Sequence, residues 1–113
     1  MAYPREVNIG VKLLNSKGAE EVEVINVKNI TPFADYYIIA TCPSERALGG
    51  FSDALDEEYS KEGYEIKSIT GTPESQWVII DQGDVVIHLF TQYKRREIDL
   101  QGVVAHVESK KSR

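Results

Sequence analysis

Two runs of β-branched and aromatic residues limit the possible folds of this chain more than any other feature. The runs are Trp77–Asp81 and Asp84–Phe90, and only Gln82-Gly83 lies between them. Two such runs joined by a two-residue turn that contains glycine are typical of a tight antiparallel hairpin. The fold must therefore contain a β-sheet in which these two strands are neighbours.

The position of the turn also predicts which side chains share a face of the hairpin. With Gln82-Gly83 as the turn, Asp81 faces Asp84 and Trp77 faces His88, and opposed residues lie on one face. One face then carries a purely apolar set: Val78, Ile80, Val85, Ile87 and Leu89. The other face carries Trp77, Ile79, Val86, His88 and Phe90, with Asp81 and Asp84 at its tip.

This second face allows two interpretations. A Trp and a His with two carboxylates at the edge have the composition of a protein-binding patch, because Trp is enriched at the energetic centres of interfaces. The alternative is a second core face beneath a helix, in which the indole N–H and the imidazole find hydrogen-bond partners inside the protein. The hairpin alone leaves both open.

Apolar periodicity predicts the remaining elements along the chain. They are a helix over Pro4–Leu14, strands over Glu21–Val27 and Tyr36–Ala40, a helix over Glu45–Glu62, a strand over Tyr64–Thr70 and a short helix from Tyr93. Because the long helix forms a crossover between strands, at least one strand pair should be parallel. The expected fold is α/β, with a mixed β-sheet of about five strands flanked by helices.

Three details concern the predicted helices. Ser44 is the expected N-cap of the long helix, and Gly63 stands where a left-handed cap would end it. Gly49-Gly50 costs roughly 1 kcal/mol per glycine inside that helix, which suggests a close approach of helix and sheet. Gly10 weakens the apolar stripe of the first helix.

Charge and cysteine content restrict the partners and the compartment. The chain has 13 Lys and Arg against 18 Asp and Glu, a formal charge of −5. This balance disfavours the phosphate backbone of nucleic acid and suits a basic protein surface, although it equally serves solubility. The one cysteine, Cys42, cannot form an internal disulfide, and no apolar run approaches the roughly 20 residues that span a bilayer. We therefore expect a cytoplasmic protein with no membrane partner and no sequence-specific nucleic-acid partner.

No residue pattern predicts catalysis, a metal or a cofactor. Asp81, Asp84 and His88 are poor metal ligands as a set, because His88 lies about 13 Å along the strand from Asp84 at about 3.3 Å per residue. Cys42 precedes a helix, where a thiolate would be stabilised, but it lacks a second cysteine and the arginine of a phosphatase loop. Glycine-rich phosphate loops are absent from the sequence. We expect a protein that is not an enzyme.

Two segments resemble the ribosomal silencing factor family, also called RsfS or Iojap. They are Phe33–Ala40, followed by Ser44-Glu45-Arg46, and Trp77–Phe90. Their order and separation are specific together, and the resemblance extends from about residue 21 to residue 100. It implies a nucleotidyltransferase-like fold without the Gly-Ser…Asp-x-Asp signature of those enzymes, which this sequence lacks.

The resemblance also implies a function. Members of the family bind the large ribosomal subunit through its fourteenth protein, block joining of the small subunit and so repress translation, with no cofactor. The family motifs place the partner-binding or interface-supporting residues at Asp35, Tyr36, Trp77, Asp81, Asp84 and His88. The chain departs from the family near its C-terminus, where Ile98–Val104 replaces an aromatic pattern and contains Gly102.

The expected organisation is one domain over 1–113, with a core of about 4–101 and a basic tail over 102–113. Two rival functions stay open on the sequence. One is a homodimeric interaction module that uses the Trp77 and His88 face on itself. The other is a nucleotide-binding enzyme on a similar fold.

Overall fold

A computed structural model describes residues 3–98 of the chain. Its helices are α1 (Arg5–Ser16), α2 (Glu45–Lys61) and α3 (Gln92–Glu97), with a 3-10 turn, η1, at Pro73–Ser75. Its strands are β1 (Glu20–Asn26), β2 (Tyr36–Cys42), β3 (Ser68–Thr72), β4 (Trp77–Asp81) and β5 (Val85–Thr91).

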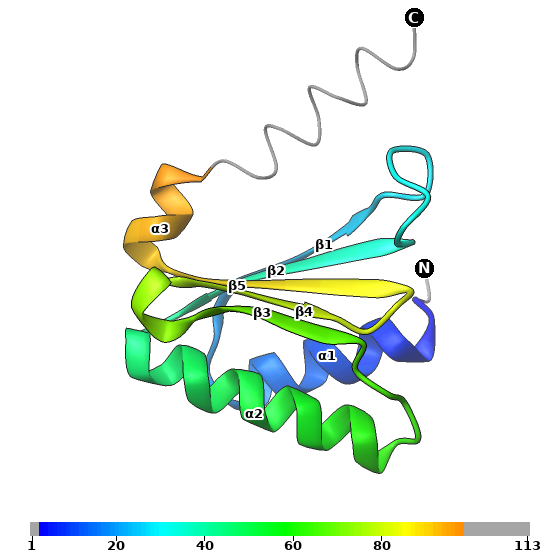
Figure 1. The fold of residues 1–113 in the computed structure, drawn as a ribbon, viewed down its shortest axis with the longest axis horizontal. Helices are drawn as coiled ribbons and strands as arrows, with labels where there is room; N and C mark the ends of the chain where they lie inside the picture. Colours follow the sequence, from blue (N-terminus) through cyan, green and yellow to red (C-terminus); the bar gives the residue numbers. More distant parts are fainter. Residues whose placement is uncertain (1–2, 99–113) are drawn as a thin grey trace, which may run out of the picture.

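The five strands form one mixed sheet in the order β1-β2-β5-β4-β3 (Figure 1). The β2–β5 pair is parallel and every other neighbouring pair is antiparallel. A parallel pair requires a long connection, and here the chain between β2 and β5 contains α2, β3 and β4. The predicted α/β fold with a mixed sheet of five strands and at least one parallel pair is confirmed.

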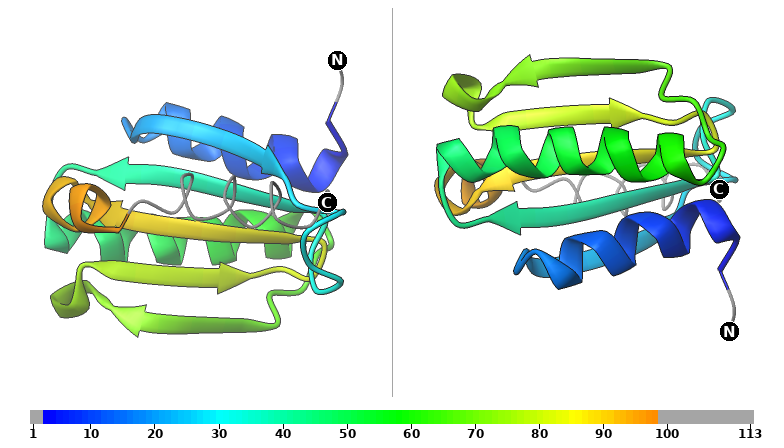
Figure 2. Two further views of the ribbon diagram at one scale, coloured as in Figure 1. Left: turned by 90° about the horizontal axis from the view of Figure 1, so that it is seen from above. Right: turned by 90° about the horizontal axis from the view of Figure 1, so that it is seen from below.

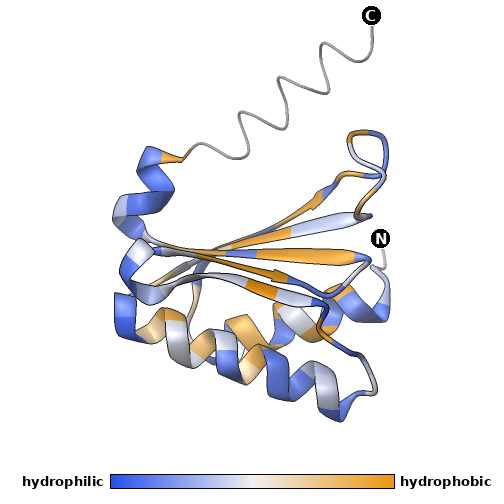
Figure 3. Ribbon diagram, in the orientation of Figure 1, coloured by the Kyte–Doolittle hydropathy of each residue, from blue (hydrophilic) through white to orange (hydrophobic). Residues whose placement is uncertain are grey.

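The main core lies between the sheet and α1 and α2, which cover the same face (Figures 1 and 2). Alternating residues of β2, β4 and β5 supply its sheet side, since successive side chains point to opposite faces. They include the predicted apolar set Val78, Ile80, Val85, Ile87 and Leu89, all at most 2% exposed. Figure 3 shows apolar residues, in orange, along the central strands and many hydrophilic residues, in blue, in the helices.

The ends of α2 follow the sequence prediction. Ser44 Oγ accepts a hydrogen bond from the Ala47 backbone N–H at 3.1 Å, which satisfies one unpaired donor of the first turn. Gly63 follows the helix with a φ of +89°, a left-handed conformation that glycine adopts without a Cβ penalty.

The predicted hairpin exists, but the predicted turn and register are wrong. Trp77 pairs with Phe90 and Asp81 with Val86, so Gly83-Asp84 forms the two-residue turn. The Gln82 N–H donates to the Val85 carbonyl at 2.9 Å, and the Gly83 N–H donates to Asp81 Oδ1 at 2.9 Å. Gly83 has a φ of +119°, which suits glycine at the first central position of such a turn. The register differs by two residues, so the two faces of the hairpin keep the predicted residues.

The strand predicted over Tyr64–Thr70 begins later, at Ser68, and continues to Thr72. Tyr64 and Ile66 instead pack against the main core before the chain reaches the sheet edge. Their apolar side chains are compatible with a strand, but partial burial against the core removes them from water without strand pairing. The C-terminal departure at Ile98–Val104 and the predicted tail over 102–113 lie almost wholly outside the described residues.

The glycines of the helices have roles other than those that the sequence suggested. A Cβ on Gly50 would meet no atom within 4 Å, and a Cβ on Gly49 would meet only Pro73 Cγ at 3.4 Å. Neither glycine therefore permits a close contact of α2 with the sheet. A Cβ on Gly10 would lie 2.7 Å from the Tyr59 hydroxyl and 2.9 Å from Ile38 Cδ1, so the close approach occurs at α1.

Two alanine substitutions should therefore have opposite effects on stability. Gly50→Ala should raise the free energy of unfolding by about 1 kcal/mol, because only the helix propensity changes. Gly10→Ala gains the same helix propensity but should lower that free energy by about 1–2 kcal/mol. The added methyl group would force the fully buried Tyr59 and Ile38 side chains to shift within a packed core. Urea denaturation at neutral pH measures both. Equal shifts of the same sign would contradict the close approach at Gly10.

Candidate functional site

The sheet face opposite α1 and α2 carries an aromatic cluster. We call the cluster the open-face cluster and define it as Tyr37, Trp77, His88 and Phe90. The His88 ring lies 4.8 Å from the Tyr37 ring and 6.0 Å from the Trp77 ring, and the Trp77 and Phe90 rings lie 5.0 Å apart. Within residues 3–98, α3 is the helix on this side of the sheet, and it lies at one end (Figure 1).

His88 is neutral at physiological pH, and one of its ring nitrogens has no partner within the described part of the chain. The Trp77 indole N–H donates to His88 Nδ1 at 3.2 Å, so the proton of the neutral ring resides on Nε2. His88 is 6% exposed, and its buried Nε2 has no hydrogen-bond partner among residues 3–98. Burial lowers the pKa of His88 to about 4, because it disfavours the charged imidazolium. Burial of the His88 and Phe90 rings and pairing of the indole agree with the second interpretation of this face, an internally paired core face. Among residues 3–98, only His88 Nε2 in the cluster is left without the expected internal partner.

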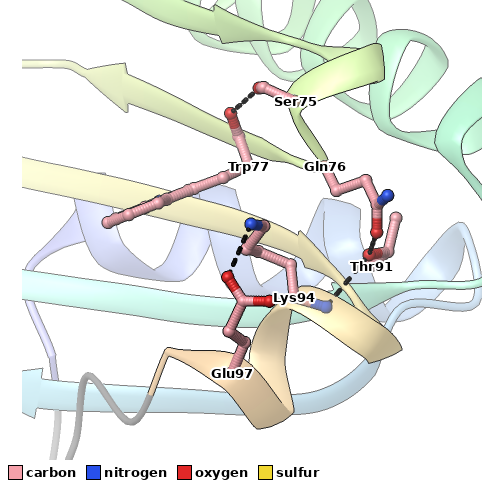
Figure 4. A network of polar contacts seen from close by, with 6 residues as sticks. All are labelled: Ser75, Gln76, Trp77, Thr91, Lys94 and Glu97. Carbon is pink, nitrogen blue, oxygen red and sulfur yellow. Dashed lines mark hydrogen bonds and ion pairs between the residues drawn. The ribbon is translucent and has the colours of Figure 1, made fainter.

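Helix α3 is fixed to the sheet beside the cluster. The Thr91 hydroxyl donates to Gln76 Oε1 at 2.7 Å and accepts from the Lys94 N–H at 3.3 Å, so it joins the start of α3 to the residue before Trp77 (Figure 4). Arg95 donates to the Glu21 carbonyl at 2.7 Å, to the Thr41 hydroxyl at 3.0 Å and to Glu23 Oε2 at 3.3 Å. These bonds secure one border of the open face.

Three aspartates lie at the opposite end of the sheet, where the Lys67 side chain also lies beside the turn, 3.2 Å from the position of a Cβ on Gly83. The Asp84 carbonyl accepts hydrogen bonds from the backbone N–H groups of Asp35, at 2.8 Å, and Tyr36, at 3.1 Å. The start of β2 and the turn between β4 and β5 are therefore side by side. Asp84 is exposed, whereas Asp35 and Asp81 are half-buried. We call Asp35, Asp81 and Asp84 the acidic end.

The predicted site residues thus form two groups and one outlier. Trp77 and His88 lie in the open-face cluster, and the three aspartates lie at the acidic end. Tyr36 is buried among the core residues on the face that α1 and α2 cover, with Lys28 Nζ 5.3 Å from its ring centroid. Tyr36 therefore supports the start of β2 from beneath.

The sequence reasoning missed Tyr37 and Arg95. Tyr37 lies in an uninterrupted apolar run, so alternation could not assign it to a face; its place beside His88 follows from the parallel pairing of β2 with β5. Arg95 lies in the predicted short helix from Tyr93, and its bonds to β1 and β2 depend on contacts distant in sequence.

The residues that the structure describes contain neither an activated thiol nor a group of side chains that could hold a metal ion. Cys42 is buried, and burial raises the pKa of its thiol to about 12, so it is a packing residue. Within residues 3–98, no three His, Cys, Asp or Glu side chains are placed to hold a metal ion. The same part of the chain contains no helix long and apolar enough to cross a membrane.

Comparisons with known proteins agree on one family. Residues 2–112 match the family model described as "Ribosomal silencing factor during starvation". The ribosomal silencing factor RsfS of Halalkalibacterium halodurans is 33% identical over 101 residues, which cover 89% of this chain and 86% of that protein. The RsfS of Bacillus subtilis is 26% identical over 95 residues, covering 84% of this chain and 80% of that protein.

Solved structures show the same fold. A crystal structure of a Bacillus halodurans protein superposes with a TM-score of 0.77 at 31% identity, covering 86% of this chain and 90% of that one. A crystal structure from Chromobacterium violaceum gives a TM-score of 0.86 at 20% identity, covering 93% of this chain and 88% of that one.

Proposed function

The chain belongs to the ribosomal silencing factor family, and from that membership we propose that it represses translation by binding the large ribosomal subunit. The bound protein blocks joining of the small subunit by occupying space at the joining face. The partner on the subunit is its fourteenth protein, and the proposed place of action is the cytoplasm.

The observation that supports this proposal most is the family match over residues 2–112, and the aromatic cluster on the sheet face opposite α1 and α2 adds to it. Aromatic residues are enriched at the buried centres of protein interfaces. Tyr37 and Trp77 are half-buried in that face and leave part of their surface accessible to a partner, whereas His88 and Phe90 are buried.

The acidic end gives the proposed interface its charge preference. Ribosomal proteins that bind RNA expose Lys and Arg, and opposite charges across an interface raise the association rate and fix orientation. Steric occlusion requires no chemistry from the bound protein. Retention on the subunit is sufficient, provided that the complex outlives the encounter with a small subunit.

The proposed division of labour gives each predicted residue a role. Trp77 contacts the partner through the open face and His88 supports it by accepting the indole hydrogen bond, while Asp81 and Asp84 orient the partner electrostatically. Asp35 and Tyr36 hold the start of β2 beside the turn that carries Asp84. In the rival homodimer, the same face would be occupied by a second copy, so dimer formation and subunit binding would compete.

Reversing one charge at the acidic end tests this proposal. We expect Asp84→Lys to weaken binding to isolated large subunits about 10-fold, because attraction to a basic surface becomes repulsion. The Asp84 side chain is exposed and forms no side-chain hydrogen bond within the described residues, so the fold should persist. Co-sedimentation over a range of protein concentrations gives the affinity, and light scattering of mixed subunits gives the extent of joining.

A matched control separates local from overall charge. Asp53→Lys makes the same change of charge on α2, on the covered side of the sheet, and should leave affinity and joining near wild type. Equal losses in both variants would assign the effect to net charge alone. If the wild-type protein neither sediments with large subunits nor reduces joining, the proposed function is wrong.

A further inference from the structure

Phe33 is the most exposed large apolar side chain of the described residues, with 84% of its surface accessible. It lies in the loop between β1 and β2. Exposure of a whole Phe ring gives no folding energy, because hydrophobic stabilisation is proportional to the area removed from water. A ring held in this way is available for contact with another molecule.

The loop that carries Phe33 is a platform whose conformation is fixed by a small core and by hydrogen bonds. Val27 and Ala34, which flank the loop, form a second small core with Ile25, Ile30, Tyr37 and Val86. The N–H groups of Ile30 and Thr31 both donate to the Val27 carbonyl at 3.0 Å, and the Phe33 N–H donates to Thr31 Oγ1 at 3.1 Å. Pro32 restricts the backbone directly before Phe33. Little conformational entropy would be lost when such a loop meets a partner.

This platform is continuous with the open-face cluster. Tyr37 belongs to the small core under the loop, and its ring lies 4.8 Å from that of His88. The loop rises at one end of the sheet on the side away from α1 and α2, and α3 rises on the same side at the other end (Figure 1). A partner that covers the open face would therefore meet Phe33 at its border.

The surroundings of Phe33 indicate the chemistry of that partner. Asp35 follows two residues later, and the exposed Asp84 is hydrogen-bonded to the backbone of Asp35. Lys28, the one cation of the loop sequence, lies over the Tyr36 ring with its Nζ 5.3 Å from the ring centroid. A loop with an exposed Phe ring and one aspartate, next to the turn that carries the exposed Asp84, is unsuited to the phosphates of RNA and complements an apolar pocket bordered by Lys or Arg.

We propose that Phe33 is an anchor residue that inserts into an apolar pocket on a basic protein of the large ribosomal subunit. This inference rests on the proposed function and adds to it the loop between β1 and β2 as a second contact region. The ring fills the partner pocket, and Asp35 and Asp84 face the basic residues around it.

The test compares Phe33→Ala with Tyr93→Ala in binding to isolated large subunits. Tyr93 is the matched control, an aromatic residue that is 67% exposed on α3 at the other end of the open face. We expect Phe33→Ala to bind at least 10-fold more weakly, Phe33→Leu to retain part of the affinity, and Tyr93→Ala to stay within twofold of wild type. All three variants should unfold at the wild-type temperature, because the altered rings are exposed.

Each contrary result has a separate meaning. If the wild type binds and Phe33→Ala binds within twofold of it, the anchor is wrong while the proposed function stands. Equal weakening by Tyr93→Ala would likewise overturn the assignment to this loop. If the wild type binds deproteinised large-subunit RNA, and Phe33→Ala weakens that binding, the partner is RNA and the inference is wrong. Absence of wild-type binding to subunits would overturn both proposals.

Discussion

Replacing Gly71 by alanine is expected to lower the free energy of unfolding by about 3–4 kcal/mol, the largest loss that we expect from one added methyl group. Gly71 has a φ of +89°, and a Cβ there would lie 2.2 Å from the Trp77 carbonyl oxygen. That oxygen also accepts a hydrogen bond from Ser75 Oγ at 2.9 Å, so the backbone at Trp77 is held in place. Urea denaturation followed by Trp fluorescence measures the loss.

Gly18→Ala is the control for the backbone conformation alone. Gly18 has a similar φ of +87°, but a Cβ there would meet no atom within 4 Å. Its substitution should cost only the left-handed strain, about 1–2 kcal/mol. If the two variants lose equal stability, β3 does not approach β4 as closely as described. Because Trp77 begins β4, Gly71→Ala should also weaken binding to large subunits.

The second large effect is a loss of stability on acidification. The pKa of His88 is lowered to about 4 in the folded protein from an ordinary value near 6.5, so the unfolded chain binds a proton more readily than the folded one. Above pH 6.5 the His88 ring is neutral in both the folded and the unfolded chain, so its titration does not change stability there. As the pH decreases from about 6.5 to about 4, only the unfolded chain takes up the proton, and the free energy of unfolding falls. Between pH 7.5 and pH 4.5 we expect a loss of about 2.5 kcal/mol from this residue.

A His88→Gln variant isolates this contribution. Glutamine retains an acceptor for the Trp77 indole and does not titrate, so the difference in unfolding free energy between wild type and variant should change with pH by that amount. The carboxylates titrate in both proteins and cancel in the difference. A difference that stays constant from pH 7.5 to pH 4.5 would show that His88 is not buried as a neutral ring.

The sequence determined the local features of this protein. The period-two pattern of Trp77–Phe90 assigned the correct residues to each hairpin face even though the turn was misplaced, because a shift of two residues preserves the alternation. The bounds of α2 followed from Ser44 and Gly63, whose effects on the backbone are local. The motifs around Phe33–Ala40 and Trp77–Phe90 were sufficient to indicate the family.

The tertiary structure alone decided which of these features are neighbours. Parallel pairing of β2 with β5 places Tyr37 beside His88, and the contact of Asp35 with Asp84 joins the Phe33 loop to the acidic end. No local pattern specifies such pairs, since β2 has the same apolar composition whichever strand it contacts. Strand order depends on how α1 and α2 bury the whole sheet face at once, and that is a property of the folded chain.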